Sequence, residues 1–188
     1  ELDSINMNLT SSPVLGLNGN VDINRLIVDS MQLDTVRLAV VSDTSTTHYT
    51  LQVRNNPGNP QYVFNSIFQG AVLSNGLYVQ GSIYDRANRL GVQLGLSAEI
   101  EKRGVMFHLY GDNPILGYKE FKVNNDNYCF LGNDRRVSAN VTLSASDGQG
   151  VQLFSDDEDS TALQDLTLTL HRFDLEKTLS VLPYTPNV

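Results

Sequence analysis

The chain has 188 residues and a formal net charge of −8, from 13 Lys and Arg against 21 Asp and Glu. No stretch gathers the basic residues, which argues against nucleic acid and anionic lipid headgroups as partners, because both require clustered cations. The single cysteine, Cys129, excludes an internal disulfide and a thiolate-rich metal site. No apolar run approaches the length of a membrane-spanning helix, so we expect any signal or anchor to lie outside these residues.

Apolar and polar residues alternate along the first third of the chain, which is the period of a strand with one apolar face. The segments with this period are 2–9, 24–40 and 48–53. In the second of them, Leu33 is followed in step by Val36, Leu38 and Val40. We therefore expect short strands separated by polar turns.

The central third shows the alternation most clearly, in segments 64–73, 76–85 and 89–100. Asn75-Gly76 predicts a type I′ hairpin turn between the first two, and the polar residues 85–89 predict a loop of hairpin length. These segments predict a meander. In the last of them Val92, Leu94 and Leu96 fall on one face, which raises the question of what that face contacts.

The remaining segments keep the period of two as far as the C-terminal region. They are 103–111, 119–123, 127–131, 136–146, 150–155 and 163–173. Segment 103–111 is partly apolar on both faces. Only 174–182 has the pattern of a helix, in which Asp174 caps the first turn, Leu175, Leu179 and Leu182 share a face, and Pro183 ends it.

The predicted fold class is therefore all-β, with more than ten strands and one short C-terminal helix. The period alone does not separate an open curved sheet from a closed sandwich, because each buries one face. In a sandwich the apolar face contacts a second sheet of the same chain. In an open sheet it is available to a ligand or partner.

Catalytic motifs with a stated mechanism are absent, including G-x-S-x-G, the phosphate-binding loops and H-E-x-x-H. His48, His108 and His171 are isolated, and we interpret them as surface or packed strand residues. The acidic run Asp156 to Asp159 lacks the spacing and turn glycine of a calcium loop, and we interpret it as a solvated loop. We expect no catalytic, metal or cofactor site.

Two alternatives stay open at this stage. A glycosidase needs only two carboxylates, which any two strands can supply. A carbohydrate- or ligand-binding β-sandwich of a secreted or surface protein would use a row of aromatic side chains, although tryptophan, the strongest stacking residue, is missing. The candidate aromatic residues are Tyr62, Phe64, Phe68, Tyr78, Tyr84, Phe107, Tyr110, Tyr118, Phe121 and Tyr128.

Two stretches resemble the TamB and AsmA-like family of cell-envelope proteins, in the form found in Bacteroidetes-type bacteria. In LQDLTLTLHRFDLEKTLSVLPYTPNV, residues 163–188, an alternating-leucine strand runs into a DL helix start, a leucine helix and a proline. Residues 81–146 are similar in their low-charge hairpin, the P-x-x-x-G turn from Pro114, the K-x-F-x-V-N strand from Lys119 and the N-x-Y segment at Asn127. Together the two stretches make up about half of the chain.

The resemblance implies that residues 1–188 form a single β-rich segment inside a longer protein, with 174–182 beginning the next repeat. That protein would be anchored in the inner membrane and extend through the periplasm as a sheet folded lengthwise into an apolar trough, a β-taco. The implied function is non-catalytic: phospholipid transport between membranes, outer-membrane protein assembly with an Omp85-type barrel through the full-length chain, or both. Unpaired edge strands would also favour self-association.

The residues expected to line the trough and contact phospholipid acyl chains are apolar strand positions. They are Val92, Leu94, Leu96, Val137, Val141, Leu143, Leu166, Leu168 and Leu170.

Overall fold

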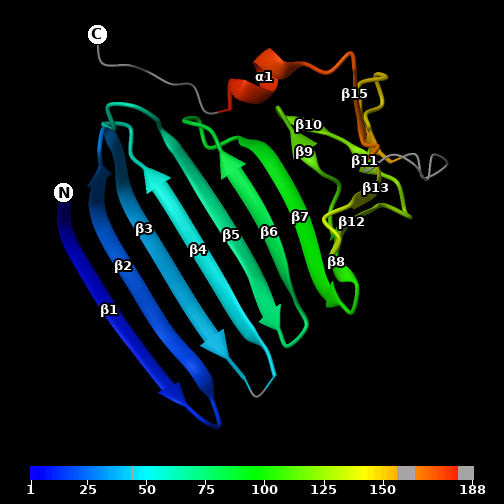
Figure 1. Ribbon diagram of the computed structural model, residues 1–188. Coiled ribbons are helices and arrows are strands. Elements are labelled where there is room, and N and C mark those ends of the chain that lie inside the picture. Colours follow the sequence, from blue (N-terminus) through cyan, green and yellow to red (C-terminus); the bar gives the residue numbers. More distant parts are fainter. Residues whose placement is uncertain (44, 156–163, 182–188) are drawn as a thin grey trace.

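A computed structural model describes residues 1–43, 45–155 and 164–181 (Figure 1). Within these ranges the chain forms fifteen strands, all in one hydrogen-bonded sheet, and one short helix. Each strand pairs antiparallel with its neighbours. The predicted all-β class with a single C-terminal helix is confirmed.

The first seven strands form an unbroken meander in which each strand pairs with the next along the chain. Consecutive hairpins have this topology because a short turn brings the chain back beside the strand it has just left. The strands are β1 (Leu2–Ser12), β2 (Gly16–Val28), β3 (Met31–Ser42), β4 (Thr47–Asn55), β5 (Phe64–Leu73), β6 (Gly76–Tyr84) and β7 (Leu90–Glu101).

The remaining strands continue the sheet beyond β7 in shorter pieces. The order along the sheet is β8, β12, β13, β14 and β15, while β9 pairs with β7 and β10, and β11 pairs with β13. Their bounds are β8 (Gly104–Leu109), β9 (Ile115–Leu116), β10 (Lys119–Glu120), β11 (Lys122–Val123), β12 (Tyr128–Gly132), β13 (Val137–Ser144), β14 (Gly150–Phe154) and β15 (Thr167–His171).

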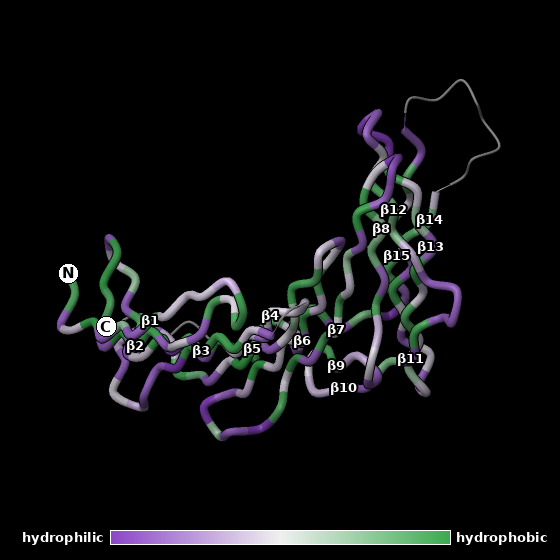
Figure 2. The backbone as a smooth tube through the Cα atoms, turned by 90° about the horizontal axis from the view of Figure 1, so that it is seen from below, coloured by the Kyte–Doolittle hydropathy of each residue, from purple (hydrophilic) through white to green (hydrophobic). Residues whose placement is uncertain are grey.

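The sheet is open and sharply bent. Figure 2 shows β1 to β7 as one extended wall, with β8 and β12 to β15 rising from its end as a second wall. No second sheet covers the first wall among the described residues, so of the two arrangements left open by the sequence the chain adopts the open curved sheet.

Two turns differ from the sequence prediction. Leu73 pairs with Gly76, so the β5–β6 loop consists of Ser74 and Asn75. Neither Asn75 nor Gly76 has the positive φ that a type I′ turn requires, so that prediction is wrong. Gly76 instead permits a close approach of β7, since a Cβ there would lie 2.3 Å from the Ala98 carbonyl oxygen.

The second difference is a hairpin inside segment 24–40. β2 ends at Val28 and β3 begins at Met31, with Asp29 at φ 54° in the turn. Asp tolerates this left-handed backbone conformation better than most residues, and a two-residue connection follows.

The helix is shorter than predicted. α1 covers Leu175–Leu179, and the side chain of Asp174 accepts a hydrogen bond from the backbone N–H of Lys177 at 2.8 Å, as its capping role requires. The chain leaves the helix at Ser180, which lets Val181 pack in the interior with 1% of its surface exposed. Leu182 and Pro183 lie outside the described residues. No helix in the described ranges has the length and apolar character needed to cross a membrane.

A buried carboxylate fastens the β6–β7 loop to the β9–β10 turn. Asp85 accepts hydrogen bonds from the backbone N–H groups of Ala87 (2.8 Å) and Arg89 (2.9 Å), from the Arg89 guanidinium (2.8 and 2.9 Å) and from the Tyr118 hydroxyl (2.8 Å). Burial opposes ionisation of Asp85, but these hydrogen bonds outweigh it and lower its pKa to about 2. The Arg89 guanidinium also lies over the Tyr118 ring, 4.9 Å from its centre.

Replacing this carboxylate should destabilise the fold in a pH-dependent way. Asp85→Asn removes the charge and leaves donors of Arg89 or Tyr118 without an acceptor, so we expect the free energy of unfolding to fall by roughly 1 to 3 kcal/mol at neutral pH. Because the pKa of Asp85 in the folded chain, about 2, is below its ordinary value of 3.8, its stabilisation is complete above about pH 4 and is lost as the pH falls toward 2. Urea unfolding at stepped pH values measures the difference.

The control is Asp112→Asn, which changes an exposed carboxylate in the loop before β9. Because Asp112 is exposed, this variant should have the same free energy of unfolding as the parent at neutral pH. A stability difference between Asp85→Asn and the parent that stays constant from pH 6 to pH 2 would contradict the role given to the Asp85 charge.

Candidate functional site

Cross-strand register places the apolar residues of the first wall on one face. Residues directly opposite each other in an antiparallel pair lie on the same face, so a row can be followed from strand to strand. The central row consists of Met7, Val21, Leu38, Leu51, Phe68, Gly81 and Leu94. Gly81 leaves room for its neighbour, since a Cβ there would lie 2.9 Å from the Phe68 ring.

The rows on either side have the same character. One consists of Leu9, Gly19, Val40, Tyr49, Gly70, Val79 and Leu96, and the other of Ile5, Ile23, Val36, Val53, Ser66, Ile83 and Val92. Ser66 is the one hydroxyl in the second of these rows, and its Oγ donates to the Val53 carbonyl at 3.1 Å. We refer to the three rows together as the apolar face.

The apolar face continues onto the second wall. Ala98 of β7 lies opposite Phe107, which lies opposite Cys129, which lies opposite Ala139. From Ala139 the alternation along β13 places Val137, Val141 and Leu143 on this face. Their partners Leu153, Leu168, Val151 and Leu170 follow on β14 and β15. Burial raises the pKa of the Cys129 thiol, which lies between Phe107 and Ala139 on this face.

Eight of the nine residues proposed from the sequence to line a trough, all except Leu166, are thus placed on one side of the sheet by pairing or alternation. Val92, Leu94, Leu96, Val137 and Val141 are partly buried, and Leu143 is buried. Leu166 immediately precedes β15 and, with Leu168 and Leu170, is exposed. Their degree of burial therefore falls toward the β15 edge of the sheet.

The opposite face is polar and nearly without lysine. The row behind the central one consists of Asn6, Asp22, Arg37, Gln52, Ile67, Ser82 and Gln93. The Arg37 guanidinium pairs with the Asp22 carboxylate at 3.2 Å. Amides and hydroxyls form hydrogen bonds with water, so this is the side of the wall suited to solvent.

No second sheet lies over the apolar face among the described residues. Within its three rows the exposed residues are Met7 (66%), Ile5 (53%) and Leu9, all on β1, while the other row members are partly or fully buried. Beyond the rows, by alternation, Leu17, Val72 and Ile100 on the same side are also exposed. A contiguous exposed apolar surface of this kind usually marks a site that binds a ligand, a membrane or another protein. We therefore take the apolar face as the candidate site.

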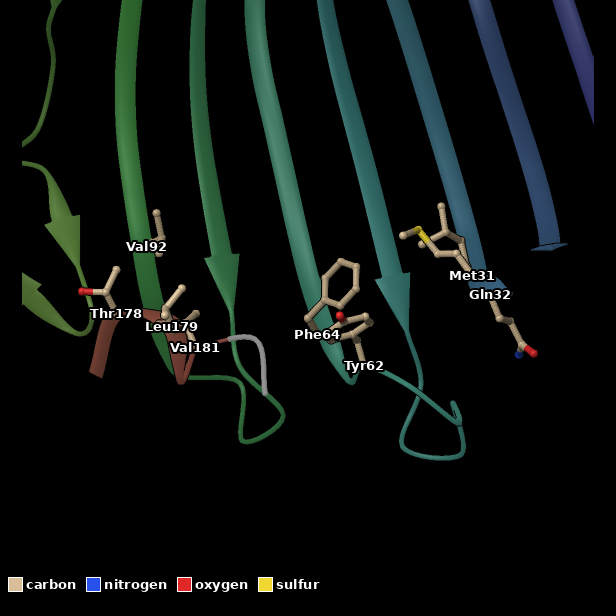
Figure 3. Close-up of a pocket in the computed structure, with 9 residues that line it drawn as sticks. Met31, Gln32, Tyr62, Phe64, Val92, Thr178, Leu179 and Val181 are labelled. Carbon is tan, nitrogen blue, oxygen red and sulfur yellow. The ribbon is translucent and has the colours of Figure 1, made fainter. Parts of the chain in front are cut away.

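At one end of the face, α1 covers a cavity of about 410 Å³ (Figure 3). Its walls come from the start of β3, the chain before β5, the start of β7 and the α1 region. The lining residues are Met31, Gln32, Leu33, Tyr62, Phe64, Val92, Thr178, Leu179 and Val181. None of them carries a charge, so the cavity suits an apolar group rather than an ionic one.

Polar side chains beneath the cavity fix the loop that supplies Tyr62. The Asn59 Nδ2 donates to the Gln32 carbonyl and to the Asp34 carboxylate, both at 3.2 Å. Its Oδ1 accepts from the backbone N–H groups of Gln61 and Tyr62 at 2.9 and 3.1 Å. Asn59 is 7% exposed, so these hydrogen bonds replace those to water and hold the loop against β3.

Glycines allow the α1 region to lie close to the sheet. A Cβ on Gly91 would lie 2.4 Å from Val181 Cγ1, and one on Gly117, where φ is 60°, would lie 2.8 Å from Thr178 Oγ1. The α1 region therefore sits directly on the backbone of β7 and of the β9–β10 turn. Phe173, just before α1, packs against Phe121 with ring centres 6.0 Å apart.

The residues considered for other chemistry are not brought together. His108 Nδ1 lies 2.6 Å from the Asn127 carbonyl oxygen, while His48 and His171 are on separate strands. The described residues contain no group of three or more His, Cys, Asp and Glu able to hold a metal ion. The acidic run 156–159 lies outside the described residues.

The candidate aromatic residues do not form one row. Among those on strands, Phe64, Phe68 and Phe107 lie on the apolar face. Tyr78, Tyr84 and Tyr128 lie on the polar face. Tyr78 meets Tyr110 edge-on at 5.5 Å between ring centres.

Sequence reasoning missed the cavity. It treated the helix only as the start of another repeat and did not connect Leu179 or Val181 with Met31 and Phe64, which are more than a hundred residues away along the chain. The one sequence feature that indicated this contact was the apolar side of the helix, which requires a packing partner elsewhere in the chain.

A methyl group at Gly91 should displace the α1 region. Gly91→Ala places a Cβ 2.4 Å from Val181, whose side chain is almost completely buried, so we expect the free energy of unfolding to fall by roughly 1 to 3 kcal/mol. Hydrogen exchange of the amides at 175–181 should accelerate in the same variant. Urea unfolding and exchange mass spectrometry measure the two effects.

Gly58→Ala is the matched control, because a Cβ there has no neighbour within 4 Å. It should change neither quantity appreciably. If the two variants had the same free energy of unfolding and the same exchange rates at 175–181, the packing of Val181 would not require a glycine at position 91.

Comparisons with protein-family models, with curated proteins and with solved structures find no match. Function therefore has to be inferred from the geometry of this chain, whose main features are the apolar face, its polar reverse and the uncharged cavity under α1.

Proposed function

We propose that this chain is a non-catalytic segment of a TamB-like envelope protein and that its apolar face holds phospholipid acyl chains during transport between membranes, supports outer-membrane protein assembly, or both. The observation that carries the proposal is the apolar face itself, which runs in register across the strands of the first wall and has no second sheet over it among the described residues.

The energetics favour a face of this kind for lipid transfer. A diacyl lipid has on the order of thirty methylenes, at about 0.8 kcal/mol each, so keeping its chains in water costs roughly 20 kcal/mol or more. A carrier in an aqueous compartment must therefore offer apolar surface along the whole path. Adjacent rows of Leu, Ile, Val, Met and Phe provide it, and the polar reverse keeps the wall in contact with water.

The cavity under α1 supports the lipid-chain assignment over a charged ligand. Its lining is uncharged, and its polar groups are limited to the side chains of Gln32, Tyr62 and Thr178. A hydrocarbon chain gains free energy when it leaves water for such a lining. A phosphate or carboxylate would lose its hydration there without gaining a charged partner.

The proposal gives the protein a compartment and partners. The segment works in the periplasm of a diderm bacterium, as part of an inner-membrane-anchored protein. An Omp85-type outer-membrane barrel engages the full-length chain. These assignments follow from the resemblance of residues 81–146 and 163–188 to the TamB and AsmA-like family.

Lipid retention should depend on the apolar face and not on its reverse. The parent protein, purified under mild conditions, should yield phospholipid in stoichiometric amount on mass spectrometry of organic extracts. Leu94→Asp places a carboxylate in the central row, where a bound chain would have to desolvate it. The lipid recovered should fall by about tenfold, equivalent to about 1.4 kcal/mol of binding free energy.

Gln93→Asp provides the matched control, because it adds the same charge one residue away on the polar face. It should retain lipid at the parental level. Leu168→Asp adds a carboxylate to the same face at a residue that is 62% exposed, so this substitution should disturb folding little. It should also lose lipid. Circular dichroism must show an unchanged sheet. A lipid-free parent, or Leu168→Asp retaining all its lipid, would refute the proposal.

A further inference from the structure

A polar pocket of about 320 Å³ lies at the end of the first wall where the β4–β5 and β6–β7 loops are found (Figure 1). Its walls come from the end of β4, the start of β5 and the loop after β6, and most of its lining residues are polar. Two of them are arginines, Arg54 and Arg86, and we refer to it as the arginine pocket. It differs in chemistry from the uncharged cavity under α1, although Phe64 lines both.

Strand register and one fixed loop bring the two arginines together. Arg54 of β4 lies opposite Asn65 of β5, and Asn65 lies opposite Tyr84 at the end of β6, so these three residues share the polar face. Arg86 follows in the loop that the hydrogen bonds of Asp85 hold in place. The two arginines are 32 positions apart along the chain, so their grouping exists only in the folded protein and does not appear as a basic stretch in the sequence.

The two guanidinium groups have no anionic partner in the part of the chain that the structure describes. Neither Arg54 nor Arg86 forms a side-chain hydrogen bond or an ion pair with a described residue. The one carboxylate of the lining, Asp85, is 5% exposed and already accepts hydrogen bonds from Arg89 and Tyr118. The pocket therefore presents two uncompensated positive charges in a chain whose net charge is −8, which favours an anionic ligand there.

Amide groups add neutral donors beside the arginines. The Asn65 Oδ1 accepts a hydrogen bond from the Gln52 Nε2 at 2.8 Å, which leaves the Asn65 Nδ2 as a donor. Asn88 lines the pocket at φ 56°, and its backbone N–H donates to the Asp85 carbonyl at 2.9 Å, which fixes the turn that carries it. Guanidinium groups bind phosphate through paired N–H bonds, and amide donors can satisfy the oxygens that remain.

Phosphate is the anion that this set of donors fits best. A phosphate monoester carries a charge of about −1.5 to −2 and three strong acceptor oxygens, whereas a carboxylate carries a single charge and two oxygens. The pocket volume of about 320 Å³ lies within the range of small-molecule sites, roughly 300 to 1,000 Å³, so there is also room for the group that bears the phosphate.

We propose that the arginine pocket binds the phosphate group of a phosphorylated small molecule or of a lipid headgroup, with Arg54 and Arg86 as the residues that neutralise it. This inference goes beyond the proposed function, because recognition of phosphate by the pocket does not require acyl chains on the apolar face.

Calorimetric titration of the chain with inorganic phosphate at low ionic strength measures the site. The parent should bind one phosphate per chain. Arg54→Gln and Arg86→Gln should each raise the dissociation constant by about tenfold, because each removes a charged donor. Both arginines are exposed, so neither substitution should disturb folding, and circular dichroism checks this.

Arg103→Gln is the matched control. It removes the same charge from an exposed arginine in the turn between β7 and β8, at the opposite end of β7 from the pocket. This variant should bind phosphate like the parent. An equal loss in Arg103→Gln and Arg86→Gln would overturn the proposal, because it would mean that phosphate responds only to the net charge of the chain.

A second titration, with dihexanoyl phosphatidic acid below its micelle concentration, separates the two sources of phosphate. If this lipid binds about tenfold or more tightly than inorganic phosphate and loses affinity in both arginine variants, the pocket takes a lipid headgroup. If the two probes bind equally and both depend on the arginines, it takes a soluble phosphate compound. A parent that binds neither probe, or lipid binding that survives both arginine substitutions, would overturn the phosphate site, and the second of these results would leave the proposed lipid function standing.

Discussion

The structure depends above all on register between neighbouring strands. Side chains in a strand alternate between two faces, so a slip of one residue in any hairpin would move a whole set of apolar side chains to the solvent side. From Met7 to Leu94 the pairing keeps apolar residues opposite apolar residues, or opposite a glycine, through six successive interfaces. The one irregularity in the β6–β7 pairing lies at its end, between Ile83 and Tyr84, where it leaves the central row unchanged.

Register alone leaves the ends of the sheet and its bend to be fixed by other interactions. Buried polar side chains do this where backbone groups would otherwise lack partners. Asn127, 6% exposed, accepts from the Leu109 N–H at 2.7 Å and donates to the Leu109 carbonyl at 3.1 Å, so it replaces a strand partner where β8 ends. Asp85 and Asn59 have the same role in the loops at the other ends of strands.

The largest energetic consequence of this fold is an apolar face without a covering sheet. α1 closes part of it near the start of β7, but the surface around Met7 and Ile5 stays in contact with water. A ligand or partner that covers such a surface in the folded chain also stabilises the fold by mass action. A ligand that binds this face would therefore raise the free energy of unfolding.

The sequence by itself determined most of the strands and which side chains share a face within them, but it did not predict residues 16–23 of β2 or the short strand β9. It predicted the segment that became β5 with its observed bounds, the cap at Asp174 and the shared side of eight of the nine apolar residues, all except Leu166, because these follow from a local period and from the chemistry of single residues. It did not determine the turns at Ser74-Asn75 and Asp29-Ser30, where cross-strand packing decides the outcome. Nor did it show what covers the apolar face, since a period of two is the same in an open sheet and in a sandwich. The bend between β7 and β8, and the return of Val181 to Gly91, depend on contacts between residues far apart in the chain, and only the tertiary structure decided them.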